Sequence, residues 1–204
     1  MTVPILILAG GSSSRMGRRH KLLETVHGQP LLRLQAWRAL KTSRDVTVLI
    51  RPDQPALQHV LDGLPVTILT ANEALEGMGG SLRAGTTAHL REKCFLMLLA
   101  DLVDIEANDM RALITARNKN ARAAHIWQAT TEDGKPGNPV LFDRAVYNDL
   151  LDLHGDEGAR KLLLRHKDEL AYVPLQGQRA RMDLDTPEDW AAWRATQIQV
   201  SAES

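Results

Sequence analysis

Residues 3–17 read VPILILAGGSSSRMG, an apolar stretch that runs directly into glycines and serines. The apolar part, from Val3 to Ala9, is typical of a strand that is buried on both faces of a sheet. Gly10 and Gly11 end this strand, and small residues allow the backbone to approach a ligand closely. Consecutive backbone N–H groups in such a loop can form a nest for phosphate oxygens. The stretch therefore predicts a buried strand followed by a loop suited to an anionic ligand.

Apolar strand-like segments alternate with helix-like segments through the first 130 residues. The expected strands are 46–50, 66–69, 94–100 and 123–129, and the expected helices are 30–40, 56–61, 81–90 and 109–117. This alternation predicts an α/β fold with a mostly parallel central sheet. Ligands bind beyond the carboxyl ends of the strands in such sheets, so Gly10, Gly11 and Asp101 are expected to face one crevice.

The pattern changes after Thr130. Residues 132–139 are rich in glycine and proline and are expected to form a connector. Helices at 143–153 and 157–166, short strands at 172–175 and 182–184, and a frayed tail at 199–204 complete the expected elements. Thr186 and Pro187 predict the start of a final helix, with Thr186 as its N-cap.

The composition excludes several classes of protein. Hydrophobic residues make up 44% and charged residues 25% of the 204 residues, which are ordinary globular values. The 25 basic residues equal the 25 acidic ones, which argues against a protein that coats nucleic acid or an anionic membrane. Cys94 is the single cysteine, so no internal disulfide can form. No apolar run is long enough for a membrane span and no signal peptide is evident, so a cytoplasmic location is expected.

Two cations accompany the glycine–serine loop. Arg15 offers a fork of N–H donors and Lys21 a point charge, and both suit the phosphates of a nucleotide. The loop is not a Walker A loop, because no Gly-Lys-Ser/Thr follows, and its glycines do not fit the G-x-G-x-x-G pattern. The alternative is an ordinary turn with solvated basic residues.

The segment from Leu8 to Gly17, with Lys21, resembles the signature of MobA/MocA-type nucleotidyltransferases. Further segments that resemble this family follow in order along the chain at 76–82, 99–101, 134–142, 155–160 and 183–189. The resemblance implies a Rossmann-like three-layer α/β/α fold of the nucleotide-diphospho-sugar transferase type. It implies one domain over 1–204, with a nucleotide-binding half at 1–130 and an acceptor-binding half at 131–198.

The implied activity is Mg²⁺-dependent transfer of a nucleotide from an NTP to the terminal phosphate of molybdopterin, with release of pyrophosphate. The segment 76–82 resembles the cytidylyltransferase branch, which favours CTP over GTP. A recipient molybdoenzyme is a further implied partner. Three alternatives stay open: a nucleotidyltransferase that uses GTP, a transferase that acts on a sugar or alditol phosphate, and a non-catalytic protein that binds nucleotide or cofactor.

The resemblance also implies the roles of individual residues. Arg15 and Lys21 are the implied catalytic cations. The implied NTP-binding residues are Leu8, Ala9, Gly10, Gly11, Ser12, Ser13, Ser14, Gly77, Met78 and Ser81. The implied Mg²⁺ ligands are Asp101 and either Asp185, which we favour, or Asp183. The implied acceptor-binding residues are Gly137 and Asn138.

Simpler structural roles remain open for several of these residues. Asp101 could begin a loop or cap a helix, and Asp183 and Asp185 could be solvated strand residues. Ser81 could be the N-cap of its helix, and Asn138 could be a turn residue that bonds its own backbone. The chain also departs from the family pattern, because no proline follows Asp101, His20 replaces a common aspartate, and Asn138 replaces a common histidine.

Overall fold

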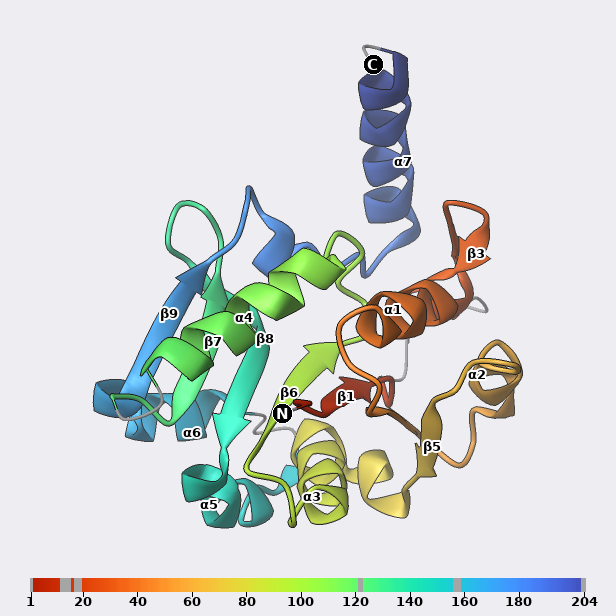
Figure 1. Cartoon of the computed structure of the whole chain (residues 1–204). Coiled ribbons are helices and arrows are strands. Elements are labelled where there is room, and N and C mark those ends of the chain that lie inside the picture. The colour runs from red at the N-terminus through yellow and green to blue at the C-terminus, as the bar shows by residue number, and fades with distance from the viewer. Residues whose placement is uncertain (1, 12–15, 17–19, 121–122, 156–158, 203–204) are drawn as a thin grey trace.

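A computed structural model of the chain describes residues 2–11, 16, 20–120, 123–155 and 159–202. Its centre is one seven-stranded sheet (Figure 1). The strands lie in the order β5 (Thr67–Thr70), β4 (Val46–Ile50), β1 (Ile5–Leu8), β6 (Cys94–Leu99), β8 (Pro136–Asp143), β7 (Ile126–Thr130) and β9 (Leu170–Pro174). The first strand of the chain therefore lies in the interior of the sheet.

Six of the seven strands run in one direction, and β8 runs against them between β6 and β7. The predicted mostly parallel sheet is confirmed. The predicted connector at 132–139 is wrong at its end, because β8 begins at Pro136. Thr130 of β7 pairs with Pro136, and the Gln128 side chain donates to the Gly137 carbonyl at 3.0 Å. Contacts with β7 therefore hold this segment extended, despite its glycine and proline content.

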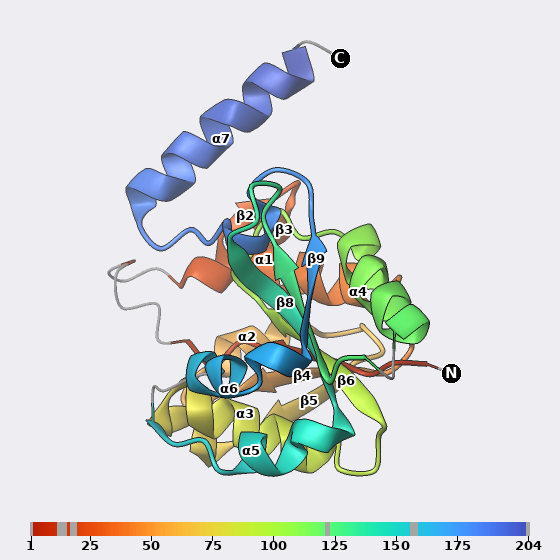
Figure 2. The same ribbon diagram turned by 90° about the vertical axis from the view of Figure 1, so that its left-hand side faces the viewer.

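Helices cover both faces of the sheet and complete the three layers (Figures 1 and 2). One face packs against α1 (Leu31–Leu40), α2 (Pro55–His59), α4 (Ala107–Asn120) and the start of α7 (Pro187–Ala202). The other face packs against α3 (Met78–Ala88), α5 (Tyr147–Leu151) and α6 (Arg160–Arg165). Short elements connect these helices and strands. They are a hairpin of β2 (Thr25–Val26) and β3 (Gln29–Pro30) and the 3-10 turns η2 (Lys21–Leu23), η3 (Asn72–Glu76), η4 (Arg144–Val146), η6 (Lys167–Glu169) and η7 (Arg179–Arg181).

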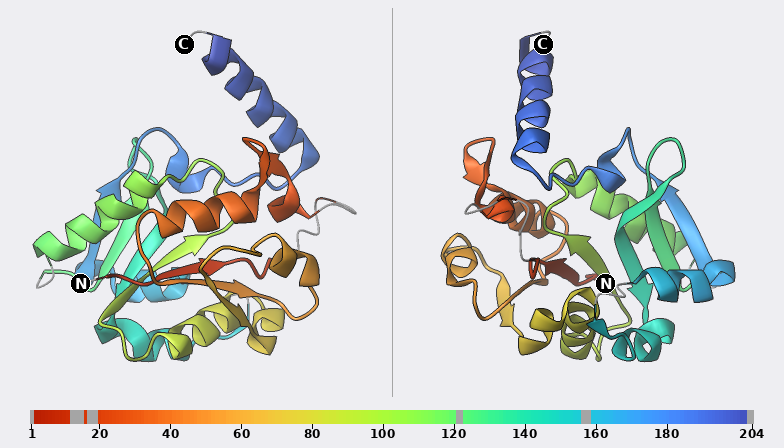
Figure 3. Two further views of the ribbon diagram at one scale, coloured as in Figure 1. Left: turned by 45° about the vertical axis from the view of Figure 1, so that its right-hand side comes forward. Right: turned by 180° about the vertical axis from the view of Figure 1, so that it is seen from behind.

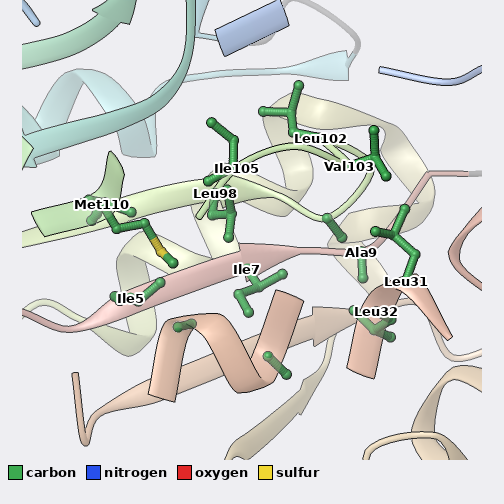
Figure 4. Packing of buried hydrophobic residues seen from close by; sticks show 14 of the residues in the cluster. Ile5, Ile7, Ala9, Leu31, Leu32, Leu98, Leu102, Val103, Ile105 and Met110 are labelled. Carbon is green, nitrogen blue, oxygen red and sulfur yellow. The ribbon is translucent and has the colours of Figure 1, made fainter. Parts of the chain in front are cut away.

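The side chains of β1 alternate between the two halves of the core. Ile5 and Ile7 pack in the cluster with α1 and α4, whereas Leu6 and Leu8 pack in the cluster with α3 and α5. Figure 4 shows Ile7 close to Leu98 of β6 in the first of these clusters. A strand buried on both faces explains the continuous apolar run in this part of the sequence.

Replacing Leu98 by alanine tests this core. Leu98 is fully buried, so its truncation leaves a cavity and lowers the free energy of unfolding by about 2–5 kcal/mol. Leu90 is 40% exposed, and Leu90→Ala is expected to change it by about 0.5 kcal/mol or less. Chemical denaturation of both variants measures the difference, and equal effects would contradict this description of the core.

Several predicted boundaries shift. Helix α3 begins at Met78, three residues before the predicted start, so Ser81 lies inside the helix and is not its N-cap. The predicted strand at 182–184 is reduced to a single bridge between Asp183 and Leu102. The predicted frayed tail is helical through Ala202. Among the described residues, none of the helices combines the length and apolar character needed to cross a membrane.

Candidate active site

The carboxyl ends of β1 and β6 form one edge of a cavity. The two strands pair in parallel with Leu8 opposite Leu99, so Gly10 and Asp101 leave the sheet side by side. Both line a cavity of about 430 Å³, as does Gly11. The expectation that these strand ends face one crevice is confirmed. We call this space the loop cavity.

The start of α3 forms the opposite wall of the loop cavity. Gly77 precedes this helix with a φ of 112°, a left-handed conformation that favours glycine. Met78 and Ser81 also line the cavity. The Ser81 hydroxyl donates to the Gly77 carbonyl at 3.2 Å. A Cβ on Gly10 would lie 3.2 Å from the Ser81 oxygen, so the glycine allows the loop and the helix to approach closely.

The structure gathers most of the expected NTP-binding residues at this cavity. The expected residues that line it are Leu8, Gly10, Gly11, Gly77, Met78 and Ser81. Ala9 does not line it, because it is buried and its amide donates to the Leu49 carbonyl at 2.9 Å. Ser12, Ser13, Ser14 and Arg15 lie outside the described residues.

Sequence analysis did not predict a role for two charged residues at the loop cavity. Arg51 and Glu76 both line it. The Arg51 guanidinium donates from Nε to Asp53 Oδ1 at 2.9 Å and from Nη2 to Asp53 Oδ2 at 2.5 Å. Arg51 directly follows the predicted strand 46–50, so the rule that ligands bind beyond strand ends could have identified it.

Lys21 lies between two of the predicted metal-ligating aspartates. Its Nζ is 2.5 Å from Asp101 Oδ2 and 2.7 Å from Asp185 Oδ1. The Lys21 side chain is only 12% exposed. Burial disfavours its ammonium form, but the charges and hydrogen bonds of Asp101 and Asp185 outweigh burial and raise the pKa of Lys21. We call these three side chains the ion cluster.

Asp183 has a different environment. The ion pairs of Lys21 are with Asp101 and Asp185, whereas Asp183 lines a cavity of about 270 Å³ together with Asp101. Burial raises the pKa of Asp183, and the negative charges of Asp101 and Asp185 raise it further. Of the two aspartates that the sequence left open, Asp185 is therefore the one that joins the ion cluster.

The ion cluster offers oxygen atoms that fit a hard divalent cation. Asp101 Oδ1 is buried and has no hydrogen-bond partner within the described part of the chain. Mg²⁺ commonly takes one or two protein carboxylates and completes its shell with water and substrate phosphates. Among the described residues, no three or more His, Cys, Asp or Glu side chains are grouped so that they could hold a metal ion by themselves. Asp101 and Asp185 are the residues that could hold such a cation.

The start of β8 lies at the same edge of the sheet. Because β8 is antiparallel, its first residues lie beside the end of β6, and Gly137 and Asn138 line the 270 Å³ cavity with Asp101. Asn138 lies within strand β8, so the alternative prediction that it is a turn residue is wrong. A Cβ on Gly137 would lie 2.1 Å from the Ala180 carbonyl oxygen, so this close packing requires glycine.

A larger cavity of about 800 Å³ adjoins these two. It shares Met78 with the loop cavity, and Gly137 and Asn138 with the 270 Å³ cavity. Apolar side chains and the cations Arg160, Lys167 and Arg181 also line it. The sequence placed Arg160 in a segment that resembles the family. It did not indicate Lys167 or Arg181, which η6 and η7 bring to the same cavity only in the folded chain.

His20 occupies the place next to the ion cluster where the family often has aspartate. Its Nδ1 accepts from the Leu22 amide at 3.3 Å, which caps the η2 turn that carries Lys21. Burial lowers the pKa of His20, and the charges of Lys21 and Arg51 lower it further. His20 is therefore neutral near pH 7, and the η2 turn gains no charge from it.

Solved structures share this architecture. Protein Rv0371c from Mycobacterium tuberculosis H37Rv superimposes with a TM-score of 0.79 at 22% identity, over 95% of this chain and 97% of that one. A structure of Rv0371c in complex with manganese has a TM-score of 0.74 over 94% of this chain and 97% of that one, also at 22% identity. A nucleotidyl transferase from Methanothermobacter thermautotroptrophicus has a TM-score of 0.81 at 16% identity, over 98% and 99% of the two chains. At these identities the likeness shows the fold.

Sequence comparison gives the family. The purine catabolism protein PucB of Bacillus subtilis (strain 168) is 26% identical over 206 residues, which cover 93% of this chain and 96% of PucB. Residues 5–170 match the family model of the MobA-like NTP transferase domain, and this range carries Lys21, Asp101 and both walls of the loop cavity. The chain therefore belongs to the MobA-like NTP transferase domain family, and it is a nucleotidyltransferase.

Proposed function

We propose that this enzyme transfers CMP from CTP to the terminal phosphate of molybdopterin, with release of pyrophosphate and with Mg²⁺ as cofactor. The observation that carries the proposal is the ion cluster, in which Lys21 contacts Asp185 and Asp101. Asp101 lines both the loop cavity and the 270 Å³ cavity. Nucleotide would bind to the half 1–130 and acceptor to the half 131–198. A cytoplasmic location and a recipient molybdoenzyme belong to the same proposal.

The reaction joins two negatively charged groups. A phosphate oxygen of the acceptor attacks the α-phosphorus of CTP, and the bond between the α- and β-phosphates breaks. The site must hold both groups in line and neutralise their charge. A bound Mg²⁺ supplies positive charge to the phosphates and orients them.

The residues of this chain divide these tasks. The Gly10–Gly11 backbone would offer N–H groups to the nucleotide phosphates, and the start of α3 would contact the base and ribose. Lys21, with Arg15 by resemblance, stabilises the charge on the α-phosphate and the leaving pyrophosphate. Gly137 and Asn138 would contact the acceptor. Asp101 and Asp185 would hold the metal.

Pyrophosphate release tests the proposal. The enzyme is incubated with Mg²⁺ and CTP, GTP, ATP or UTP, with and without molybdopterin. We expect release with CTP only when molybdopterin is present. A preference for GTP would overturn the CTP assignment, and release only with a sugar or alditol phosphate would overturn the molybdopterin assignment. A folded sample that releases pyrophosphate under none of these conditions would contradict the proposed transfer.

A further inference from the structure

The first turns of α7 are the part of this helix that packs against the body. Trp190 and Trp193 are buried at 1% and 8% exposure, whereas Ala195 and Thr196 are exposed. Beyond them the helix projects away from the sheet (Figures 1 and 3). We call residues 190–194 the α7 base. The α7 base contacts the chain segments that carry Asp101 and Lys21, and the same helix begins next to Asp185.

The first contact reaches the segment of Asp101. Trp193 Nε1 donates to Asp104 Oδ1 at 3.0 Å, and Asp104 lies three residues after Asp101. The loop between them is held at its other side, where the Val103 amide donates to the Met182 carbonyl at 3.2 Å. The chain carries no proline in this loop, so such contacts define its shape.

The second contact reaches the segment of Lys21. Arg194 Nη2 lies 2.7 Å from Glu24 Oε2, and Glu24 donates its own amide to the Lys21 carbonyl at 3.2 Å. The His27 ring lies edge-on to Trp193, with 6.4 Å between centroids. Because Arg194 is 44% exposed, its ion pair contributes little to stability. The buried indole is the stronger anchor.

The third link is the start of the helix itself. Asp189 Oδ2 accepts the Asp185 amide at 3.2 Å and the Thr186 amide at 2.9 Å. Thr186 Oγ1 accepts the Asp189 amide at 3.1 Å, which completes a reciprocal N-terminal cap. Asp185 is therefore fixed to the first turn of α7, and the α7 base fixes that turn to Asp104.

We propose that Trp193 is a positioning residue that, through Asp104, sets the spacing of the Asp101 and Asp185 carboxylates for a divalent cation. The inference rests on the proposed function only in that these two carboxylates hold the metal. Residues that orient metal ligands from outside commonly change metal affinity about 10–100-fold when they are replaced.

Trp193→Phe tests this role, because phenylalanine keeps most of the buried surface and removes the indole N–H. Binding of Mn²⁺ in the presence of CTP is followed by the loss of the electron paramagnetic resonance signal of free Mn²⁺. We expect Trp193→Phe to weaken Mn²⁺ binding by about tenfold. Turnover at saturating metal should stay close to that of the unmodified enzyme.

Variants at Asp104 separate the hydrogen bond from charge. Asp104→Asn keeps an acceptor oxygen for the indole and should bind Mn²⁺ like the unmodified chain. Asp104→Leu removes the acceptor and should reproduce Trp193→Phe. The double variant Trp193→Phe with Asp104→Leu should bind Mn²⁺ as tightly as either single variant, since all three lose the same hydrogen bond.

Trp127→Phe is the matched control. Trp127 is fully buried in the core, so this variant is expected to lose stability and to bind Mn²⁺ normally. All measurements are made below the unfolding transitions. Unchanged Mn²⁺ affinity in Trp193→Phe, equal weakening in Trp127→Phe, or absence of Mn²⁺ binding in the unmodified chain would overturn the inference. Weakened binding in a chain that releases no pyrophosphate would sustain it and reject the proposed function.

Discussion

Lys21→Met is expected to lower turnover by about 10²–10³-fold while the chain stays folded. Methionine keeps the apolar stem of the side chain and removes the ammonium that lies between Asp101 and Asp185. Negative charge develops in the transition state on the α-phosphate and on the leaving pyrophosphate, and the largely buried Lys21 ammonium is well placed to stabilise it. Steady-state rates of pyrophosphate release at saturating nucleotide and metal measure the loss.

A control for this variant is Lys119→Met. Lys119 is exposed near the end of α4 and is remote from the three cavities. It removes the same charge from the chain, so the change in net charge is identical. Turnover of Lys119→Met should match that of the unmodified enzyme. Turnover of Lys21→Met close to that of this control would reject the role of Lys21 in the reaction.

Asp101→Asn is expected to raise the Mg²⁺ concentration for half-maximal activity by at least about tenfold. Asparagine has the same shape but no charge, and it leaves Lys21 paired with Asp185. The buried Oδ1 of Asp101, which has no hydrogen-bond partner among the described residues, is the atom best suited to a cation. A titration of pyrophosphate release against Mg²⁺ measures the shift.

The two aspartates of the closing segment should respond differently in the same titration. Asp185→Asn should also raise the Mg²⁺ requirement, because Asp185 shares the ion cluster with Asp101. Asp183→Asn should raise it less, because Asp183 faces the neighbouring cavity. The control Asp62→Asn changes an exposed residue away from the site. An unchanged titration in Asp101→Asn would exclude Asp101 as a metal ligand.

Local patterns in the sequence were sufficient for the parallel part of the sheet. The apolar runs of β1, β4 and β6 and the helical spacing of α1 predicted these elements within a few residues. Strand β8 was missed because its start, PGNP, carries turn residues. The strand pairs with the neighbouring β7 and, from Val140 onward, with β6, which is distant in the sequence, so no local pattern contains the β6 pairing.

The early start of α3 has a similar cause. Gly79 and Gly80 lower the helix propensity of its first turn, so the pattern placed the start at Ser81. A Cβ on Gly80 would lie on the Glu73 carbonyl, and a Cβ on Gly79 would lie 2.8 Å from the Gly155 carbonyl oxygen. The glycines allow close packing of the helix against η3 and against the backbone of His154 and Gly155, which only the tertiary structure reveals.

The candidate site also combines residues that the sequence predicted with residues that only the structure reveals. Motif resemblance brought together Lys21, Asp101 and Asp185, which are far apart in the chain. It did not reveal Arg51, because its neighbours carry no motif. It also did not reveal the hydrogen bond between Trp193 and Asp104, because a tryptophan in a predicted helix indicates only a core contact.

The interior place of β1 has a consequence for synthesis of the protein. Ribosomes add about 5–20 residues per second, so Cys94 and the rest of β6 are made roughly 5–20 seconds after β1. During that time one edge of a strongly apolar strand has no partner, and such edges recruit other chains. The nascent chain is thus prone to aggregation until β6 is made, and its long-range pairings make folding slow compared with a helical protein of this length.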